Sequence, residues 1–341
     1  MSTLTENVAK VTAAHAALKT AIAAKGITVP EGTKLSDMPA LVGEIEAMPA
    51  TGRRAVFSAD YATSIVVQNK FVVDLSTEEN LSRLFANCRS LTSFTLPDGF
   101  GQSATNLDNA FGGCSSLTSL TLPAGFGQSA TDITGCFSGC SKLTSITLPA
   151  VFGQNARYIH RCFQGCTVLS ALTLPAGFGQ NATHLYNCFD GCQALTSITL
   201  PSGFGQNALY LYNCFGGCKA LTSLTLPSGL GVEGANCSSF IAGCSSLTSL
   251  TIPAGFVGDA GNVDNFFGGC TSLTTITGNP DFKISVSLAA STNLTHDSLM
   301  VVINGLQTVT TTQTLTLGTA NLAKLTDEEK AVATDKGWTL A

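Results

Sequence analysis

The side chains with the most evident chemical potential in this sequence are its 13 cysteines, because thiolates bind metals and take part in redox reactions. Twelve of them fall into two series with a constant interval of 26 residues. The first series is Cys88, Cys114, Cys140, Cys166, Cys192, Cys218, Cys244 and Cys270, and the second is Cys136, Cys162, Cys188 and Cys214. No Cys-x-x-Cys pair occurs, and the spacing matches no zinc motif. We therefore interpret both series as small buried hydrophobic residues.

Other signatures of catalysis are equally weak. The segment from Gly229 to Gly234 fits G-x-G-x-x-G, but it lacks the strand and helix that a dinucleotide site requires. No H-E-x-x-H, P-loop or G-x-S-x-G motif occurs, and no nucleophile and base are suitably spaced. We expect no enzyme activity, no catalytic residue, no metal ion and no cofactor.

The elements that position these residues follow from the repeat itself. An interval of 26 residues is typical of a leucine-rich-repeat solenoid. In the unit that begins at Cys114, Leu120 and Leu122 would lie on one side of a short strand, and Pro123 would end it. Ile133 and Phe137 follow on the returning segment. One unit cannot bury its apolar edge alone, so stacked units must share a continuous core.

The units resemble a known family of repeats. Cys140–Pro149, closed by Phe163–Cys166, is similar to the BspA-type leucine-rich repeats, with an inserted Gly-Phe-Gly-Gln segment. The resemblance covers roughly residues 85–282. Such repeats occur in bacterial surface proteins and in prophage-encoded tail proteins, so the resemblance implies adhesion or recognition.

Composition excludes several classes of protein. Only 11% of residues are charged and the net charge is −5, so the basic surface of a nucleic-acid-binding protein is missing. A hydrophobic content of 44% argues against intrinsic disorder. No uninterrupted apolar run approaches the ~18 residues of a membrane span, so no membrane association is expected. The N-terminus shows no basic and apolar regions of a signal peptide.

A heptad pattern predicts a helix near the N-terminus. Its apolar seam consists of Leu4, Val8, Val11, His15, Leu18 and Ile22. A helix this short is marginal alone, so the seam needs a partner. We favour a homo-oligomer, preferably a trimer, with His15 helping to set the oligomeric state. The alternative is packing against the same chain.

The ends of the chain differ from the repeats. Residues 24–42 resemble a segment common in phage tail-fibre-type proteins, which implies attachment to a virion. We divide the chain into an oligomerisation and attachment segment (1–52), an N-terminal cap (53–84) of strands and a short helix, the solenoid (85–282) and an α/β C-terminal cap (283–341). In the last, we expect a helix from Asp297 to Leu306 and a strand with Leu315 and Leu317. A capping box at Thr326 should open a helix that ends near Gly337.

Comparison of the repeats with one another indicates where a ligand binds. Three positions just before the phenylalanine of each unit change freely, and alternation points them outward. In the central units they form one stripe: Tyr158, His160, Arg161, His184, Tyr186, Asn187, Tyr210, Tyr212 and Asn213. Tyrosine and arginine are enriched in recognition surfaces. Two alternatives remain: a tyrosine stack that only rigidifies the solenoid, and a metal site at His160 and His184.

These observations predict a phage tail-fibre-like receptor-binding protein. Its N-terminus would attach to a tail or virion particle, and its solenoid would recognise a bacterial surface receptor, either protein or glycan. The expected partners are that receptor and other tail proteins, without nucleic acid or membrane. We expect the protein to fold in the host cytoplasm and to reside in the virion tail. The alternatives are a BspA-like adhesin on the bacterial surface and a purely structural virion component.

Overall fold

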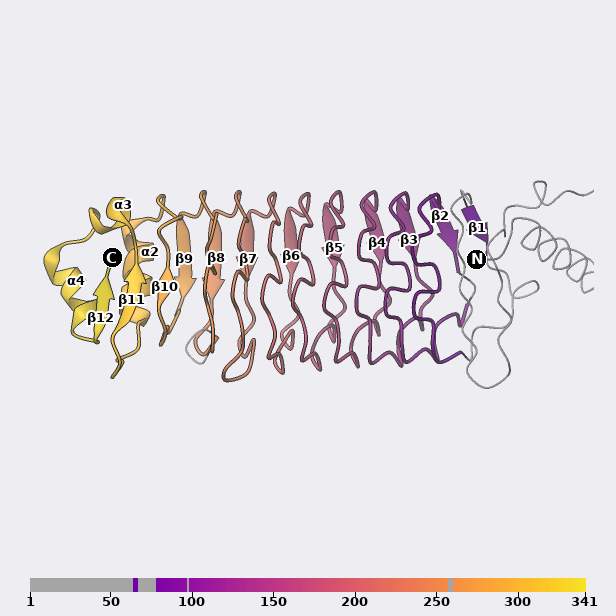
Figure 1. The fold of residues 1–341 in the computed structure, drawn as a ribbon, viewed down its shortest axis with the longest axis horizontal. Coiled ribbons are helices and arrows are strands. Elements are labelled where there is room, and N and C mark those ends of the chain that lie inside the picture. The colour runs from indigo at the N-terminus through magenta and orange to yellow at the C-terminus, as the bar shows by residue number, and fades with distance from the viewer. Residues whose placement is uncertain (1–63, 67–77, 97, 257–259) are drawn as a thin grey trace, which may run out of the picture.

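The chain forms an elongated solenoid whose coils stack along the long axis, with a C-terminal cap at one end (Figure 1). The structure is a computed structural model, and it describes residues 64–66, 78–96, 98–256 and 260–341. The predicted heptad seam, from Leu4 to Ile22, and the segment that resembles tail-fibre proteins both lie outside the described residues.

Each repeat contributes one short parallel strand to a common face of the solenoid. The strands are β1 (Ser64–Val66), β2 (Ser93–Thr95), β3 (Ser119–Thr121), β4 (Ser145–Thr147), β5 (Ala171–Thr173), β6 (Ser197–Thr199), β7 (Ser223–Thr225), β8 (Ser249–Ile252) and β9 (Thr275–Gly278). Between adjacent strands the register advances by one repeat, so that Leu120 pairs with Ile146. Hydrogen-bonded pairing of neighbouring strands forms three sheets along this face: β1-β2-β3-β4, β5-β6 and β7-β8-β9. β1 thus adds a strand before the first repeat, within the predicted N-terminal cap.

The local pattern within a repeat matches the sequence prediction. In β3 and just after it, Leu120 and Leu122 are buried while Thr121 is exposed. Pro123 follows and lacks the amide hydrogen that a further ladder bond would need. The strands are therefore only three or four residues long through the repeats.

A second line of parallel contacts runs along the other side of each coil. Single bridges join Asn80, Asn106, Asp132, Tyr158, His184, Tyr210, Asn236 and Asn262 in succession. Tight turns follow each bridge, and they need left-handed backbone. At Gly165, for example, φ is 71°. Glycine adopts this conformation without the strain that a larger residue would have.

Two columns of phenylalanine rings fill the core. Phe137 and Phe163 belong to one column and stack with ring centroids 5.4 Å apart. Phe152 and Phe178 belong to the other, with centroids 6.2 Å apart. All four rings are fully buried. Most coils place the same rings above and below their neighbours, and Leu230 and Ile241 fill the two columns where the rings are absent, so the core is continuous along the described repeats.

The cysteine columns lie beside these rings and, as predicted, are buried. All 13 cysteines are buried, and none of them forms a disulfide. The structure adds a role that the sequence did not show: the Cys166 Sγ–H donates to the carbonyl oxygen of Phe137 at 3.2 Å. The same contact, at 3.1–3.3 Å, is made by Cys114, Cys140, Cys166, Cys192, Cys218, Cys244 and Cys270. Burial raises the pKa of the Cys140 thiol to about 12, so the thiols are poor nucleophiles.

The thirteenth cysteine marks a repeat in which three core side chains change together. Cys237 takes the place that Leu211 has one repeat earlier, and Phe240 takes the place of Cys214. Ile241 replaces the phenylalanine of that position, and all three new side chains are buried. One position gains volume while two lose it, so the core tolerates the exchange.

The C-terminal cap covers the last coil. It comprises β10 (Val286–Ser287), α2 (His296–Gly305), β11 (Gln313–Thr316), α3 (Thr319–Leu322), α4 (Asp327–Thr334) and β12 (Trp338–Leu340), and its strands pair in the order β10, β11, β12. α2 and β11 lie within about one residue of the predicted helix and strand, although Leu317 falls just outside β11. The predicted capping box is present, since Thr326 and Glu329 exchange both hydrogen bonds. α4 ends at Thr334, three residues before Gly337, because the chain turns there into β12.

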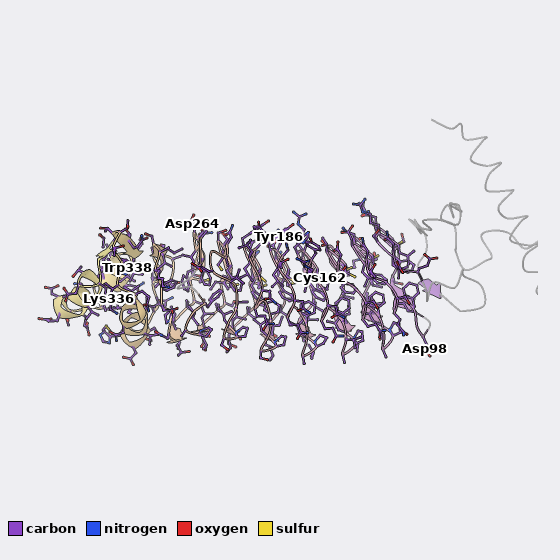
Figure 2. The ribbon with its side chains drawn as sticks, turned by 90° about the horizontal axis from the view of Figure 1, so that it is seen from below. Asp98, Cys162, Tyr186, Asp264, Lys336 and Trp338 are labelled. Carbon is purple, nitrogen blue, oxygen red and sulfur yellow. The ribbon has the colours of Figure 1, made fainter. Side chains whose placement is uncertain are left out.

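Contacts from the chain end hold the cap together. The Lys336 ammonium donates to the carbonyls of Ile303 and Asn304 at the end of α2, and the Trp338 indole N–H donates to the Gln307 carbonyl. A cation near the last carbonyls of a helix stabilises it. Figure 2 shows Lys336 and Trp338 at this end of the solenoid. In the described part of the chain, no helix has the length and apolar character needed to cross a bilayer.

Candidate recognition surface

The nine stripe residues lie together on one surface, which we call the aromatic patch: Tyr158, His160, Arg161, His184, Tyr186, Asn187, Tyr210, Tyr212 and Asn213. Successive bridges place Tyr158, His184 and Tyr210 directly beside one another. Between them, the side chains of Ile159, Leu185 and Leu211 point into the core. In Figure 2, Tyr186 and Asp264, which share a column, lie along one long side of the solenoid, with Asp98 toward the opposite side.

The inner column of the patch is a parallel stack of three rings. The centroids of His160 and Tyr186 are 4.3 Å apart with an angle of 19° between planes. Those of Tyr186 and Tyr212 are 4.6 Å apart with an angle of 9°. All three residues are half-buried. The spacing follows from the solenoid, because adjacent strands lie about 4.8 Å apart.

The outer column is more exposed and less regular. Ring centroids are 5.0 Å apart between Tyr158 and His184, and 4.7 Å apart between His184 and Tyr210. These rings are tilted by 52° and 41° to one another rather than parallel. Tyr158 and Tyr210 are 40% and 37% exposed, which is unusual for large aromatic residues. The outer column therefore offers most of the accessible aromatic surface of the patch.

The ring contacts show that the proposed rigidifying stack exists, since the rings do touch across repeats. Stacking occupies the flat faces of the middle rings. The ring edges carry the tyrosine hydroxyls, while the Nδ1 atoms of His160 and His184 lie 3.4 and 2.9 Å from threonine hydroxyls. A surface of this kind suits polar ligands, because hydroxyl groups both donate and accept hydrogen bonds.

The third column of the patch has a backbone function as well. Asn187 and Asn213 have φ values of 57° and 55°, and the same position is left-handed in every described repeat. Asparagine and glycine tolerate this conformation, which explains why they recur there. Arg83, Arg161 and Ser239 depart from this pattern, and Arg161 combines a φ of 61° with an exposed side chain. Its guanidinium carbon lies 5.8 Å from the centroid of the Tyr186 ring.

A fourth column, which was not predicted from the sequence, directly precedes the outer rings and consists of Arg157, Thr183 and Leu209. Arg157 is exposed, and Leu209 is 38% exposed despite its apolar side chain. The Thr183 hydroxyl lies 2.9 Å from the Nδ1 atom of His184 and so orients that ring. The signal was available in the 26-residue register, because this position holds threonine at Thr105 and Thr131 but arginine and leucine in the patch.

Both histidines of the patch are neutral at pH 7. Burial lowers the pKa of His160 to about 4, against a smaller opposing effect of Asp132. Burial and then the charge of Arg157 lower the pKa of His184. The centroids of the two imidazoles are 6.2 Å apart. Among the described residues, no group of three potential ligands surrounds them or any other point.

A hollow also lies on the strand-bearing side of the solenoid. It has a volume of about 460 Å³ and lies between β5 and β6, lined by Leu172, Thr173, Ile198, Thr199 and Pro201 among others. Its lining contains no charged or titratable side chain. It therefore offers less specific chemistry than the aromatic patch.

Comparison with known proteins identifies the repeats. The model of the BspA type leucine rich repeat region, in six copies, matches residues 79–206, 134–260 and 186–309. Among solved structures, a leucine rich repeat protein of T. pallidum is 17% identical with a TM-score of 0.34, covering 74% of this chain and 84% of that one. A leucine rich cell surface protein from Faecalibacterium prausnitzii A2-165 is 18% identical with a TM-score of 0.24, covering 72% and 86%.

No curated protein matches the sequence. The family match, however, extends over more than half of the chain, from residue 79 to residue 309. It agrees with the parallel strands, the constant register and the columned core described above. The chain therefore belongs to the BspA type leucine rich repeat family.

Proposed function

We propose that the repeat domain is a recognition module that binds a receptor on the bacterial surface through the aromatic patch. One observation carries the proposal: three consecutive repeats place six aromatic rings on one surface. In the flanking repeats, the same two columns hold Asn106, Asp108, Asp132, Thr134, Asn236, Ser238, Asn262 and Asp264. The fold tolerates small polar residues there, so the rings are not required for stacking the coils. Tyrosine and arginine supply much of the binding energy in protein interfaces.

We further propose that the protein is tail-fibre-like and attaches to a particle through its N-terminus. The support is the heptad seam and the resemblance of residues 24–42 to tail-fibre segments. Homo-oligomerisation, with a trimer favoured, is part of this proposal. Light scattering on the full-length chain tests it, and a monomer at all concentrations would contradict it.

A second candidate is a bacterial surface adhesin. The observation that favours it is the family match from residue 79 to residue 309, because BspA-type repeats are the kind whose resemblance implies a surface role. A structural virion component without a receptor is the third. Neighbouring genes discriminate among these: tail and baseplate genes favour the first and third, and cell-wall sorting genes the second. In all three, we propose no catalytic activity.

The test of recognition is binding of the labelled full-length protein to a panel of bacterial isolates, measured by flow cytometry. The double variant Tyr186→Ala plus Tyr210→Ala should reduce binding at least about tenfold, since central aromatic residues contribute 2 kcal/mol or more. The matched control is Thr121→Ala plus Thr225→Ala, which truncates two exposed residues of the strand face. Binding that is equal in both double variants would contradict the proposal.

A conservative pair separates recognition from mere rigidity. Tyr186→Phe plus Tyr210→Phe keeps all rings and removes two hydroxyls. We expect an unchanged melting temperature, because ring stacking persists, and weaker binding, because the ring edges face the ligand. Thermal unfolding and cell binding, measured on the same preparation, give the two readouts.

A further inference from the structure

Two arginines frame the charged end of the aromatic patch. Arg157 and Arg161 both come from the repeat that contributes Tyr158 and His160, and both side chains are exposed. Within the described residues, neither guanidinium has an acidic partner within 4 Å. Exposed cations without partners are available for an anionic ligand.

The acids nearest in the repeat register are already engaged. The Asp132 carboxylate, one repeat before Tyr158, accepts a hydrogen bond from the Thr134 amide at 2.9 Å. The Asp190 carboxylate accepts from the Gln164 side chain at 2.8 Å. Their hydrogen bonds fix local turns and neighbouring coils rather than holding the two arginines.

The patch changes character along the solenoid axis. Its first repeat presents Arg157 and Arg161, its second Thr183 and Asn187, and its third Leu209 and Asn213. Rings run through all three repeats. A ligand that spans the patch thus meets positive charge at one end, and amide, hydroxyl and aliphatic groups at the other.

The ring geometry restricts the class of anion. Single-stranded nucleic acids bind by stacking bases on free aromatic faces. Here both faces of Tyr186 are stacked against neighbouring rings, and His184 lies between two tilted rings. The centre of the patch therefore offers ring edges, tyrosine hydroxyls and guanidinium forks rather than free faces, and these groups match hydroxyl-rich molecules with carboxylate or phosphate groups.

We propose that the aromatic patch binds an acidic polysaccharide, with Arg157 and Arg161 contacting its carboxylate or phosphate groups and the ring edges contacting its hydroxyls. This inference rests on the recognition function proposed above and specifies its ligand. Carboxylate and phosphate share the chemistry that the guanidinium groups recognise, so the experiment has to distinguish these two sources.

The test uses full-length protein and bacterial cells, with soluble competitors. Oligogalacturonate provides carboxylates, its methyl ester is the neutral counterpart, and purified wall teichoic acid provides phosphates. We expect one of the two polyanions to displace the protein from cells, and the methyl ester to fail. Competition by oligogalacturonate assigns a carboxylate ligand, and competition by teichoic acid assigns a phosphate ligand.

Variants connect the competition to the patch. Arg157→Gln plus Arg161→Gln should weaken binding to cells at least about tenfold and reduce its salt dependence. The control, Lys142→Gln plus Lys219→Gln, removes the same charge from exposed positions outside the patch and should change binding less than about twofold. Equal losses in both double variants would show nonspecific attraction and overturn the inference.

The remaining outcomes separate this inference from the recognition function. If Tyr186→Ala plus Tyr210→Ala abolishes cell binding while the arginine variant binds normally, recognition stands and the acidic ligand is wrong. Failure of both polyanions to compete, or competition by oligothymidylate alone, also overturns the inference. If the wild-type protein binds no isolate and neither polyanion, both proposals fall.

Discussion

Rings stack in two regions of this molecule, the buried core and the aromatic patch, and the two stacks obey different rules. In the core, phenylalanine repeats at the same position from Phe85 to Phe215. In the patch, the equivalent positions change from polar residues to rings and back within seven repeats. Each core position meets the same neighbours above and below, so one side chain satisfies all coils. A patch position meets water, and its side chain is free to vary.

The two kinds of ring stack have similar geometry, but they contribute differently to the stability of the fold. Phe137 and Phe163 stack at 5.4 Å with both rings fully buried, whereas His160 and Tyr186 stack at 4.3 Å with both rings half-exposed. Removal of apolar area from water dominates the stabilisation, at about 25 cal/mol per Å². The shorter surface contact is thus expected to stabilise the fold less than the longer buried one.

The most direct test of this difference in stabilisation is to truncate one ring in each stack. Phe163→Ala should lower the free energy of unfolding by about 3–5 kcal/mol, because it leaves a cavity between fully packed coils. Tyr186→Ala should cost less, about 1–3 kcal/mol, because it removes two ring pairs at about 0.5–1.5 kcal/mol each from a half-buried position. Denaturant unfolding of both variants measures the difference. Equal losses would mean that the patch is a structural element like the core.

A smaller effect distinguishes cysteines that only fill space from those that also donate a hydrogen bond. The Phe137 carbonyl accepts from the Cys166 thiol and from the Cys140 amide. Cys166→Ala should therefore cost about 1 kcal/mol more than Cys237→Ala, whose thiol has no such contact among the described hydrogen bonds. Chemical denaturation of the two variants gives this difference, and identical stabilities would remove the role assigned to the sulfur–carbonyl contacts.

A substitution at Arg161 should change stability and binding in opposite directions. Arg161→Asn places a residue that tolerates left-handed backbone at φ of 61°, so stability should rise by about 0.5–1 kcal/mol. Binding to cells should fall nonetheless, because the guanidinium is lost. The reverse change, Asn187→Arg, should lower stability by a similar amount. A variant that loses stability together with binding would show that Arg161 serves the fold.

The last expected effect is a pH dependence that arises within the patch. His160 accepts a proton near pH 4 in the folded chain, whereas an unfolded chain takes it up near pH 6.5. Protons therefore favour unfolding in this window, and stability should fall as the pH decreases from about 6.5 to about 4. His160→Tyr keeps a ring in the stack and removes this titration. The wild type should lose stability relative to His160→Tyr on acidification, and parallel pH profiles would contradict the assignment.

Much of the architecture was predictable because the same residue pattern recurs in every repeat. The interval between Cys114 and Cys140 gave the period, and Leu120 and Leu122 gave the strand. The nine patch residues could be found by comparing units with one another, without other proteins. In the cap, the strand β10 and the helix α3 were not predicted, since two and four residues are too short for a periodic signal.

The sequence by itself determined the period, the buried columns and the position of the variable surface, because a fixed interval imposes the same environment on each unit. Only the tertiary structure showed that Asn187 sits on left-handed backbone, that the Cys166 sulfur meets a carbonyl, and that Arg157 joins the patch. It also showed that both faces of the Tyr186 ring are occupied by rings of the neighbouring repeats. Such properties depend on contacts between successive coils and on backbone conformation, which exist only once the coils have stacked.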